Sequence, residues 1–193
     1  MVSPPPEDGS GTRRRWLGRA ARAVIAAGSA SALGACGESL RSQLRRNSPV
    51  AETDVKLLER LLDAERYAIA AYTAAAPLLP PSAARAAKQF LAQELAHAGG
   101  LIYLVGAAGA KAPDPRASYD LGKPRGAREL LLLLERAERG QIAAYLTAIP
   151  RLAPGPVRTQ AAAYFANDAQ HLASVRLLLG EPPLPSALVT GRD

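Results

Sequence analysis

Residues 64–72 read Ala-Glu-Arg-Tyr-Ala-Ile-Ala-Ala-Tyr, and residues 137–145, 73 positions later, read Ala-Glu-Arg-Gly-Gln-Ile-Ala-Ala-Tyr. A second match has almost the same spacing, because Glu-Leu-Ala-His at residues 94–97 is followed 74 positions later by Asp-Ala-Gln-His at residues 168–171. Self-similarity at a fixed spacing indicates that one structural unit occurs twice. We therefore interpret the chain from about residue 53 onward as two copies of a single unit.

Each unit is predicted to be a pair of helices. Apolar residues recur three or four positions apart, which is the spacing of one face of a helix, and no stretch alternates with the period of a strand. Prolines and glycines interrupt the pattern, and Ser82 is the expected N-cap of the second helix. The first predicted helix covers approximately residues 53–77, and the second follows Ser82 and ends between Gly106 and Gly109. The third carries Leu131 and ends at Pro150, and the fourth covers approximately residues 156–180.

The connections between these helices predict how they are arranged. The links within each pair are short, whereas a non-helical stretch of about sixteen residues, which includes Pro113, Pro115 and Pro124, separates the two pairs. Short links place consecutive helices side by side and antiparallel. The sequence therefore predicts an all-α fold, an antiparallel four-helix bundle made of two helical hairpins with one long crossover.

The only two histidines of the chain, His97 and His171, each follow a carboxylate by three residues. Residues three apart on a helix differ by about 60° in azimuth and about 4.5 Å in height. Glu94 and His97 can therefore direct their side chains at one point, and so can Asp168 and His171. One such pair is a weak signal, because exposed helix faces produce it often, but here both pairs occupy matching places in the repeat.

Glu65 and Glu138 also occupy matching places, and all of these residues lie within the apolar faces of their predicted helices. Four buried carboxylates repel one another, so their pKa values are expected to rise in the metal-free protein. Two divalent cations would compensate this charge, and carboxylate with imidazole suits iron, manganese or zinc. One carboxylate from each of two helices and a carboxylate–histidine pair from each of the others form the ligand set of di-iron and di-manganese bundles. The predicted metal ligands are Glu65, Glu94, His97, Glu138, Asp168 and His171.

Three further polar residues lie close to this pattern. Tyr72 and Tyr145 follow Glu65 and Glu138 by seven residues, and we interpret them as core aromatics or as hydrogen-bond partners of the ligands rather than as redox tyrosines. Glu135 stands one helical turn before Glu138 and could compete with it for a metal ion. Only Glu138 matches Glu65 in the repeat, which favours Glu138 as the ligand.

The formal net charge of +7 does not indicate a nucleic-acid partner. Five arginines lie within the first 22 residues, where a targeting signal would use them. From Cys36 onward the chain has 19 Lys and Arg against 15 Asp and Glu, and these are spread over several helix faces. Such a distribution is typical of a solvated surface rather than of a track for phosphates. We expect no nucleic-acid partner.

The first 36 residues have the order of an export signal. Adjacent arginines within residues 12–17 resemble a twin-arginine signal, and after a weakly apolar stretch Leu-Gly-Ala-Cys at residues 33–36 resembles a bacterial lipobox. The alternative is a disordered basic tail with a chance cysteine, but two signals in the right order favour export. We expect an envelope protein that Cys36 anchors by a lipid to the extracytoplasmic face of the membrane. The predicted segments are a signal peptide at 1–35, a polar tether at 36–51, the bundle at 52–180 and a C-terminal tail at 181–193.

Residues from about 53 to 190 resemble the exported bacterial ferritin-like domain proteins, which are relatives of the plant desiccation-related proteins. The resemblance implies the ferritin-like bundle topology and a dinuclear metal centre. In that family the fourth helix usually offers Glu-x-x-His, whereas this chain has Asp168, whose side chain is one methylene shorter. The motifs that carry the resemblance are Glu65, Glu94-x-x-His97, residues 119–122, Glu138 with Ala144-Tyr145, Asp168-x-x-His171 and residues 188–191.

The superfamily includes ferroxidases, oxygenases, peroxide reductases and catalases, so the resemblance implies metal-dependent oxidoreduction without specifying one reaction. We expect two divalent metal ions, with iron ahead of manganese, and O₂ or peroxide as the small-molecule substrate. The alternative function is a metal-binding or structural stress-protection module without turnover.

Overall fold

The computed structural model describes residues 50–191, which form four long helices and, within this range, no strand. This confirms the all-α prediction. The predicted signal peptide, Cys36 and nearly all of the predicted tether lie outside the described residues. The helices are α2 (Val55–Ala75), α3 (Pro81–Ala107), α4 (Ala127–Ala148) and α5 (Pro156–Leu179), and the short 3-10 helices η1 (Glu52–Asp54) and η2 (Ala76–Leu78) flank α2.

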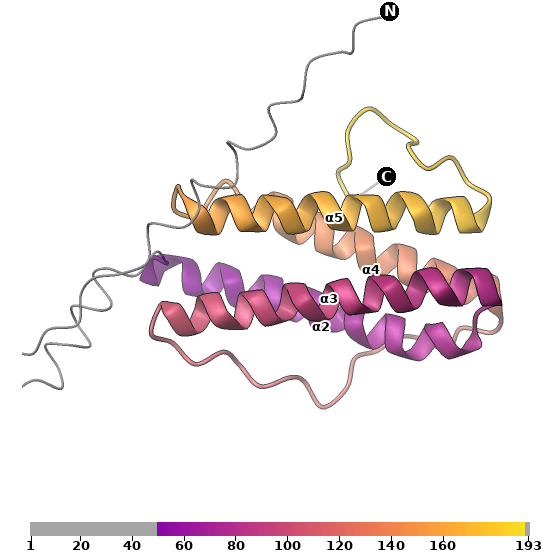
Figure 1. The fold of residues 1–193 in the computed structure, drawn as a ribbon, viewed down its shortest axis with the longest axis horizontal. Helices are drawn as coiled ribbons and strands as arrows, with labels where there is room; N and C mark the ends of the chain where they lie inside the picture. The colour runs from indigo at the N-terminus through magenta and orange to yellow at the C-terminus, as the bar shows by residue number, and fades with distance from the viewer. Residues whose placement is uncertain (1–49, 192–193) are drawn as a thin grey trace, which may run out of the picture. The chain divides into compact units, whose positions relative to one another are not determined.

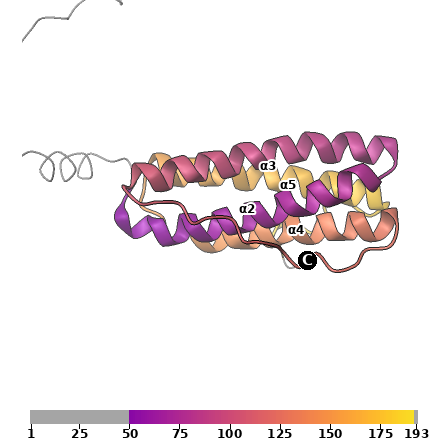
Figure 2. The ribbon, with the colours of Figure 1, turned by 90° about the horizontal axis from the view of Figure 1, so that it is seen from below.

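Two hairpins, α2–α3 and α4–α5, pack side by side into an antiparallel bundle (Figure 1). α2 packs against both α3 and α4, and α5 completes the bundle by packing against α4 and α3. The connection of residues 108–126 runs along the length of the bundle (Figure 2), so that α4 begins at the end opposite to the last turn of α3. The predicted topology with one long crossover is confirmed.

Two helix limits differ from the prediction. The prediction for Ser82 was wrong, because Pro80 is the N-cap of α3 and Pro81 is its first residue. Proline is favoured at the first helical position, since its φ angle is already helical and its missing N–H would have no partner there. The crossover has nineteen residues rather than about sixteen, because α3 ends at Ala107 and α4 begins only after Gly126, whose φ is 96°.

Apolar side chains fill the two ends of the bundle and leave a polar layer between them. One cluster lies around Tyr72, Phe90 and Leu134, and the other lies around Leu61 and Leu101. On every long helix the predicted metal ligands stand between the positions that contribute to the two clusters. Burial of this apolar surface offsets the cost of placing ionisable groups inside the bundle. None of the described helices is long and apolar enough to cross a membrane.

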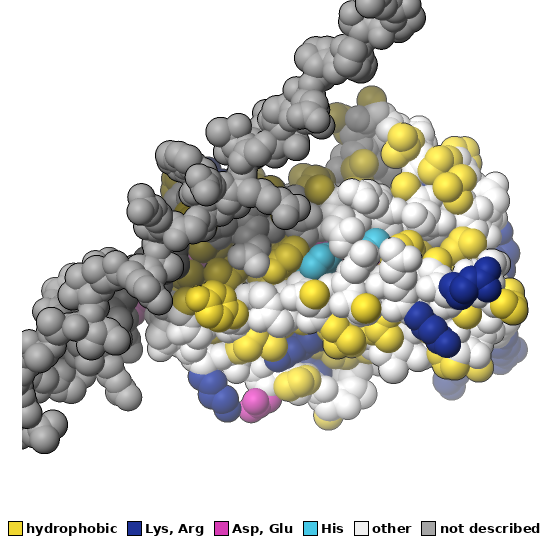
Figure 3. Space-filling view, in the orientation of Figure 1, with side chains coloured by type: hydrophobic (Ala, Val, Ile, Leu, Met, Phe, Trp, Pro, Cys, Tyr) yellow, Lys and Arg dark blue, Asp and Glu magenta, His cyan; other side chains and the backbone are white. Residues whose placement is uncertain are grey.

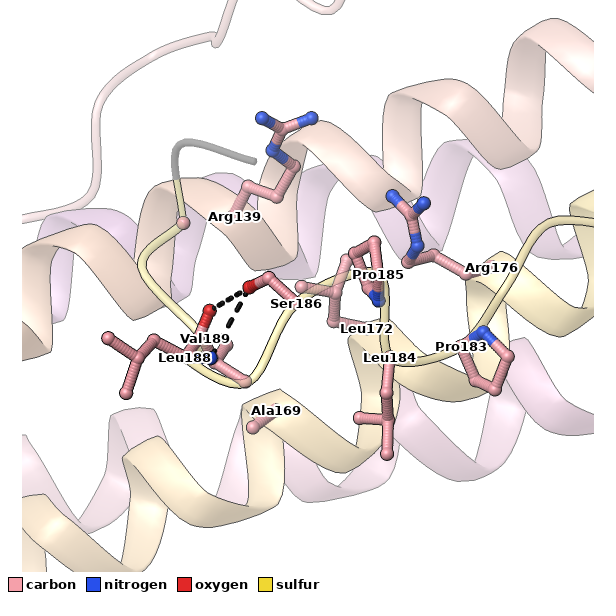
Figure 4. Close-up of a pocket in the computed structure, with 11 residues that line it drawn as sticks. Arg139, Ala169, Leu172, Arg176, Pro183, Leu184, Pro185, Ser186, Leu188 and Val189 are labelled. Atoms are coloured by element: carbon pink, nitrogen blue, oxygen red, sulfur yellow. Dashed lines mark hydrogen bonds between the residues drawn. The ribbon is translucent and has the colours of Figure 1, made fainter.

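The segment after α5 folds back along α4 and α5 (Figure 4). Arg176 Nε donates to the carbonyl oxygen of Pro182 at 2.8 Å, and the segment closes over side chains of both helices, among them Arg139 and Leu172. Gly191 has a φ of 70°, and a Cβ at this residue would clash with the carbonyl oxygen of Arg139. Only glycine fits this close approach, which explains why the last described residues can lie against α4.

Candidate metal centre

The six residues predicted as metal ligands meet in one buried cluster halfway along the bundle, and each long helix contributes to it. Their ligand atoms form two groups, and within each group all atoms lie within 4.8 Å of one another. The four carboxylates are fully buried. Glu94 and Asp168 belong to both groups, so the shorter side chain of Asp168 still reaches both. The groups are Glu65, Glu94, His97 and Asp168 on one side and Glu94, Glu138, Asp168 and His171 on the other.

In the carboxylate–histidine pairs of α3 and α5, the histidine of each helix lies against the carboxylate of the other helix. His171 Nδ1 lies 2.9 Å from Glu94 Oε1, and His97 Nδ1 lies 3.4 Å from Asp168 Oδ1. Each histidine therefore meets the carboxylate of the other helix, as expected for two copies of one unit packed antiparallel. The same ring atom, Nδ1, faces the carboxylates on both sides.

The two predicted tyrosines hold the glutamates of the opposite helix. Tyr72 Oη donates to Glu138 Oε1 at 2.5 Å, and Tyr145 Oη donates to Glu65 Oε1. Both hydrogen bonds cross the interface between α2 and α4, and each uses one oxygen of its carboxylate. Hydrogen bonds of this kind fix the orientation of a ligand from outside. The tyrosines therefore orient the glutamates and leave their second oxygens for other partners.

Gln141 was missed by the sequence reasoning, although it is fully buried beside the cluster. Its Nε2 donates to Glu65 Oε2 at 2.7 Å and to Glu94 Oε2 at 2.5 Å. One amide thus connects a carboxylate of α2 with a carboxylate of α3. The repeat could have indicated Gln141, because the first copy has an alanine, Ala68, at the matching position. A polar residue there departs from the repeat within an apolar helix face.

A second glutamine, Gln93, sets the protonation of one histidine. His171 Nε2 lies 2.5 Å from Gln93 Oε1, and because an amide oxygen only accepts hydrogen bonds, Nε2 carries a proton. In the neutral imidazole the lone pair is then on Nδ1, which is the atom that faces the carboxylates. When His171 is neutral, Gln93 therefore leaves its lone pair on Nδ1, the atom that could bind a metal ion.

Aromatic residues cover both histidines on the side of α3 and α5. The ring centroids of Phe90 and His171 are 4.2 Å apart, and those of Tyr164 and His97 are 4.3 Å apart. The hydroxyl group of Tyr164 occupies the space that a side chain at Gly100 would need. Histidine side chains are visible over α3 and α5 in Figure 3, and His97 is 6% exposed.

Glu135, the competing candidate on α4, is not part of the cluster. Its Oε1 lies 2.6 Å from Nη1 of Arg176 on α5, and both side chains are mostly buried. The charge of Glu135 is therefore compensated within the protein. The structure thus agrees with the repeat in placing Glu138, and not Glu135, among the facing carboxylates.

Burial raises the pKa of three of the four carboxyl groups. The pKa of Glu65 lies well above its usual value, that of Glu138 rises to about 8 and that of Asp168 to about 6. Glu94 differs from the expectation that all four would rise. Burial acts to raise its pKa too, but hydrogen bonds from His171 and Gln141 stabilise the charged form and bring the pKa below its usual value.

The pKa values of the two histidines are raised by the carboxylates that face them, against the effect of burial. Burial alone would lower their pKa values, but the facing carboxylates raise the pKa of His97 to about 10 and that of His171 to about 9. In the metal-free protein both imidazoles are therefore charged at neutral pH. They supply the positive charge that no lysine or arginine supplies at these positions.

The donor atoms of the cluster fit divalent cations. Among the described residues, His97 Nδ1, Glu138 Oε2 and both carboxylate oxygens of Asp168 are buried without a hydrogen-bond partner. A buried polar atom without a partner costs about 1–3 kcal/mol, and carboxylate oxygens and imidazole nitrogens are ordinary ligands of iron and manganese. The cluster is therefore compatible with a dinuclear metal site.

Comparison with known proteins agrees with the fold. A solved structure of a conserved hypothetical protein from Mycobacterium tuberculosis is 23% identical, and the match covers 72% of this chain and 99% of that one with a TM-score of 0.63. A structure of ferritin-like, diiron-carboxylate proteins from Bacillus anthracis str. Ames is 18% identical over 65% of this chain and 94% of that one, with a TM-score of 0.56. No curated protein matches the chain. The sequence profile of the ferritin-like domain matches residues 53–181, so the chain belongs to the ferritin-like domain family.

Proposed function

We propose that the chain binds two divalent metal ions, iron ahead of manganese, and uses them for oxidoreduction with O₂ or peroxide. The observation that carries the proposal is the pair of ligand groups that share Glu94 and Asp168. Two ions held in these groups would each have one histidine and one glutamate of their own, with two carboxylates in common. The diiron-carboxylate neighbour of the same fold supports this reading.

When bound, iron or manganese supplies redox equivalents and open coordination positions for a small oxidant. The protein supplies the orientation of the ligands. Gln93 keeps the lone pair of His171 on Nδ1, and Tyr72 and Tyr145 each hold one oxygen of a glutamate. The apolar clusters at both ends of the bundle exclude bulk water.

We also propose that this site works outside the cytoplasm, on a protein held at the membrane by a lipid. The support is the arginine-rich start followed by Leu-Gly-Ala-Cys at residues 33–36. A lipid anchor would supply the membrane attachment, while the bundle itself would face the envelope space.

A second candidate function is metal binding without turnover. The charged histidines favour it, because they compensate the carboxylates and allow the bundle to persist without metal. In that case the centre would act as a stress-protection or metal-binding module rather than as an enzyme.

The decisive experiment measures metal content and Fe(II) oxidation on one set of variants. The wild-type chain and the control variant Glu135→Gln are expected to retain two metal ions per chain after reconstitution, whereas Glu138→Gln is expected to lose at least one. Rapid oxidation of added Fe(II) by the wild type, with one oxidant consumed per centre, would support the enzyme. Stoichiometric binding without oxidation would support the second candidate, and no binding would refute both.

A further inference from the structure

A cavity lies at the interface of α2 and α4, under the crossover, and has a volume of about 400 Å³. Its lining comes from α2, α4 and two crossover residues, Arg116 and Tyr119. The helix residues Ala64, Gly140 and Gln141 belong to the lining. The cavity is therefore separate from the face of α3 and α5 over which the histidines are visible.

The lining carries more positive than negative charge. Arg116 is bound to Asp63 by two hydrogen bonds of 2.8 and 2.6 Å, and Tyr119 donates to the same carboxylate. This arrangement also pins the crossover to α2. Arg60 and Arg136 line the same cavity and have no acidic partner within the described part of the chain. Two guanidinium groups thus remain available, and guanidinium binds carboxylate and phosphate groups by paired hydrogen bonds.

The cavity also has an aromatic wall and an unfilled position. The rings of Tyr67 and Tyr119 pack edge to face with centroids 5.9 Å apart. In the repeat, Gly140 stands where the first copy has Tyr67, and a Cβ at Gly140 would meet no atom within 4 Å. Glycine inside a helix costs roughly 0.5–1 kcal/mol relative to alanine, and no close contact requires it here. The absent side chain leaves room in the cavity.

We propose that this cavity binds a small organic anion, whose carboxylate or phosphate group contacts Arg60 and Arg136 and whose planar body lies against Tyr67 and Tyr119. The volume, the two unpaired guanidinium groups and the aromatic wall all fit such a ligand. Gln141 lines the cavity, and its side chain also donates to Glu65 and Glu94. A ligand in the cavity would therefore be separated from the buried carboxylates by this one side chain. Binding itself needs no metal ion, so it can be tested independently of the proposed function.

Calorimetric titration of the full chain, with chelator present, tests the proposal with four probes. Benzoate and phenyl phosphate are expected to bind, inorganic phosphate more weakly, and neutral benzamide not at all. Arg60→Gln and Arg136→Gln should each weaken benzoate binding roughly tenfold, as the loss of a charge-assisted hydrogen bond does. The control Arg85→Gln removes an exposed arginine that does not line the cavity and should leave binding unchanged.

Variants at Gly140 test the cavity without touching a charge. Gly140→Leu should abolish binding because it fills the space, whereas Gly140→Ala should keep most of it and stabilise the helix. Failure of both aromatic anions to bind would overturn the proposal, as would affinities that Arg60→Gln, Arg136→Gln and Gly140→Leu leave unchanged. Equal affinity for inorganic phosphate and phenyl phosphate would overturn the role of the tyrosines. Metal content measured on the same samples separates these results from failure of the metal site.

Discussion

Replacement of Glu138 by glutamine should stabilise the metal-free protein, although it removes a proposed metal ligand. Glu138 is fully buried, and its pKa rises from 4.5 to about 8, chiefly because burial disfavours the charged form. The folded protein therefore binds a proton more readily than the unfolded chain. Its stability falls as the pH rises from the unfolded pKa through the folded one. Glutamine has nearly the same shape, can still accept the hydrogen bond from Tyr72 and does not ionise.

The size of the effect follows from the two pKa values. Linkage gives a cost of about 3 kcal/mol at pH 7 and about 1 kcal/mol at pH 5 for a group shifted in this way. Glu138→Gln is therefore expected to raise the free energy of unfolding by up to these amounts. Part of the gain is lost because His171 no longer has the carboxylate of Glu138 at 3.5 Å, but it keeps Glu94 at 2.9 Å.

Urea unfolding followed by circular dichroism, with chelator at pH 7 and pH 5, measures this difference. The matched control is Glu135→Gln on the same helix, which breaks the ion pair with Arg176 and should lower stability at both pH values. If Glu138→Gln destabilises the metal-free protein at pH 7, or has the same effect at both pH values, Glu138 is not a buried carboxylate of raised pKa. The electrostatic description of the centre would then be wrong.

Three further predictions concern stabilisation by metal, the role of Gln141 in metal binding and the lipid anchor at Cys36. Mn(II) or Fe(II) should raise the melting temperature more at pH 7 than at pH 5, because metal binds the deprotonated ligands of the folded state; an equal rise at both pH values would contradict this. Gln141→Ala should weaken metal binding by roughly 10–100-fold, measured by competition with a chelator, while Gln89→Ala on the exposed side of α3 should not. Cys36→Ser should release the protein from the membrane fraction or leave an uncleaved precursor, and mature protein that retains residues 1–35 by mass spectrometry would refute the lipid anchor.

The position of the ligand cluster could be predicted from the sequence because helix periodicity and the repeat constrain it together. Periodicity determines which residues share a face of a helix, and the repeat relates Glu65 to Glu138 without any structure. The pKa of Glu94 could not be predicted in this way. Its lowered pKa depends on hydrogen bonds from two other helices, which no local spacing reveals.

The cavity under the crossover could not be predicted for a similar reason. Its arginines and tyrosines come from segments far apart in the sequence, and their meeting depends on how residues 108–126 pack against α2. Arg116 binds Asp63 across 53 positions of the chain. Gln141 is an intermediate case, because its contrast with Ala68 was visible in the repeat, but its two carboxylate partners were not.

Two adjacent departures from the repeat link the cavity to the metal centre. Gly140 replaces the tyrosine of the first copy and leaves space, and Gln141 replaces an alanine and donates to Glu65 and Glu94. A ligand that shifts Gln141 must change the hydrogen bonding of both carboxylates, and hence their affinity for metal. Because coupling between two binding sites is reciprocal, metal must then change the affinity for the anion by the same factor. Benzoate titrations of the metal-free and the Mn(II)-loaded protein measure that factor, and equal affinities would show that Gln141 does not connect the two sites.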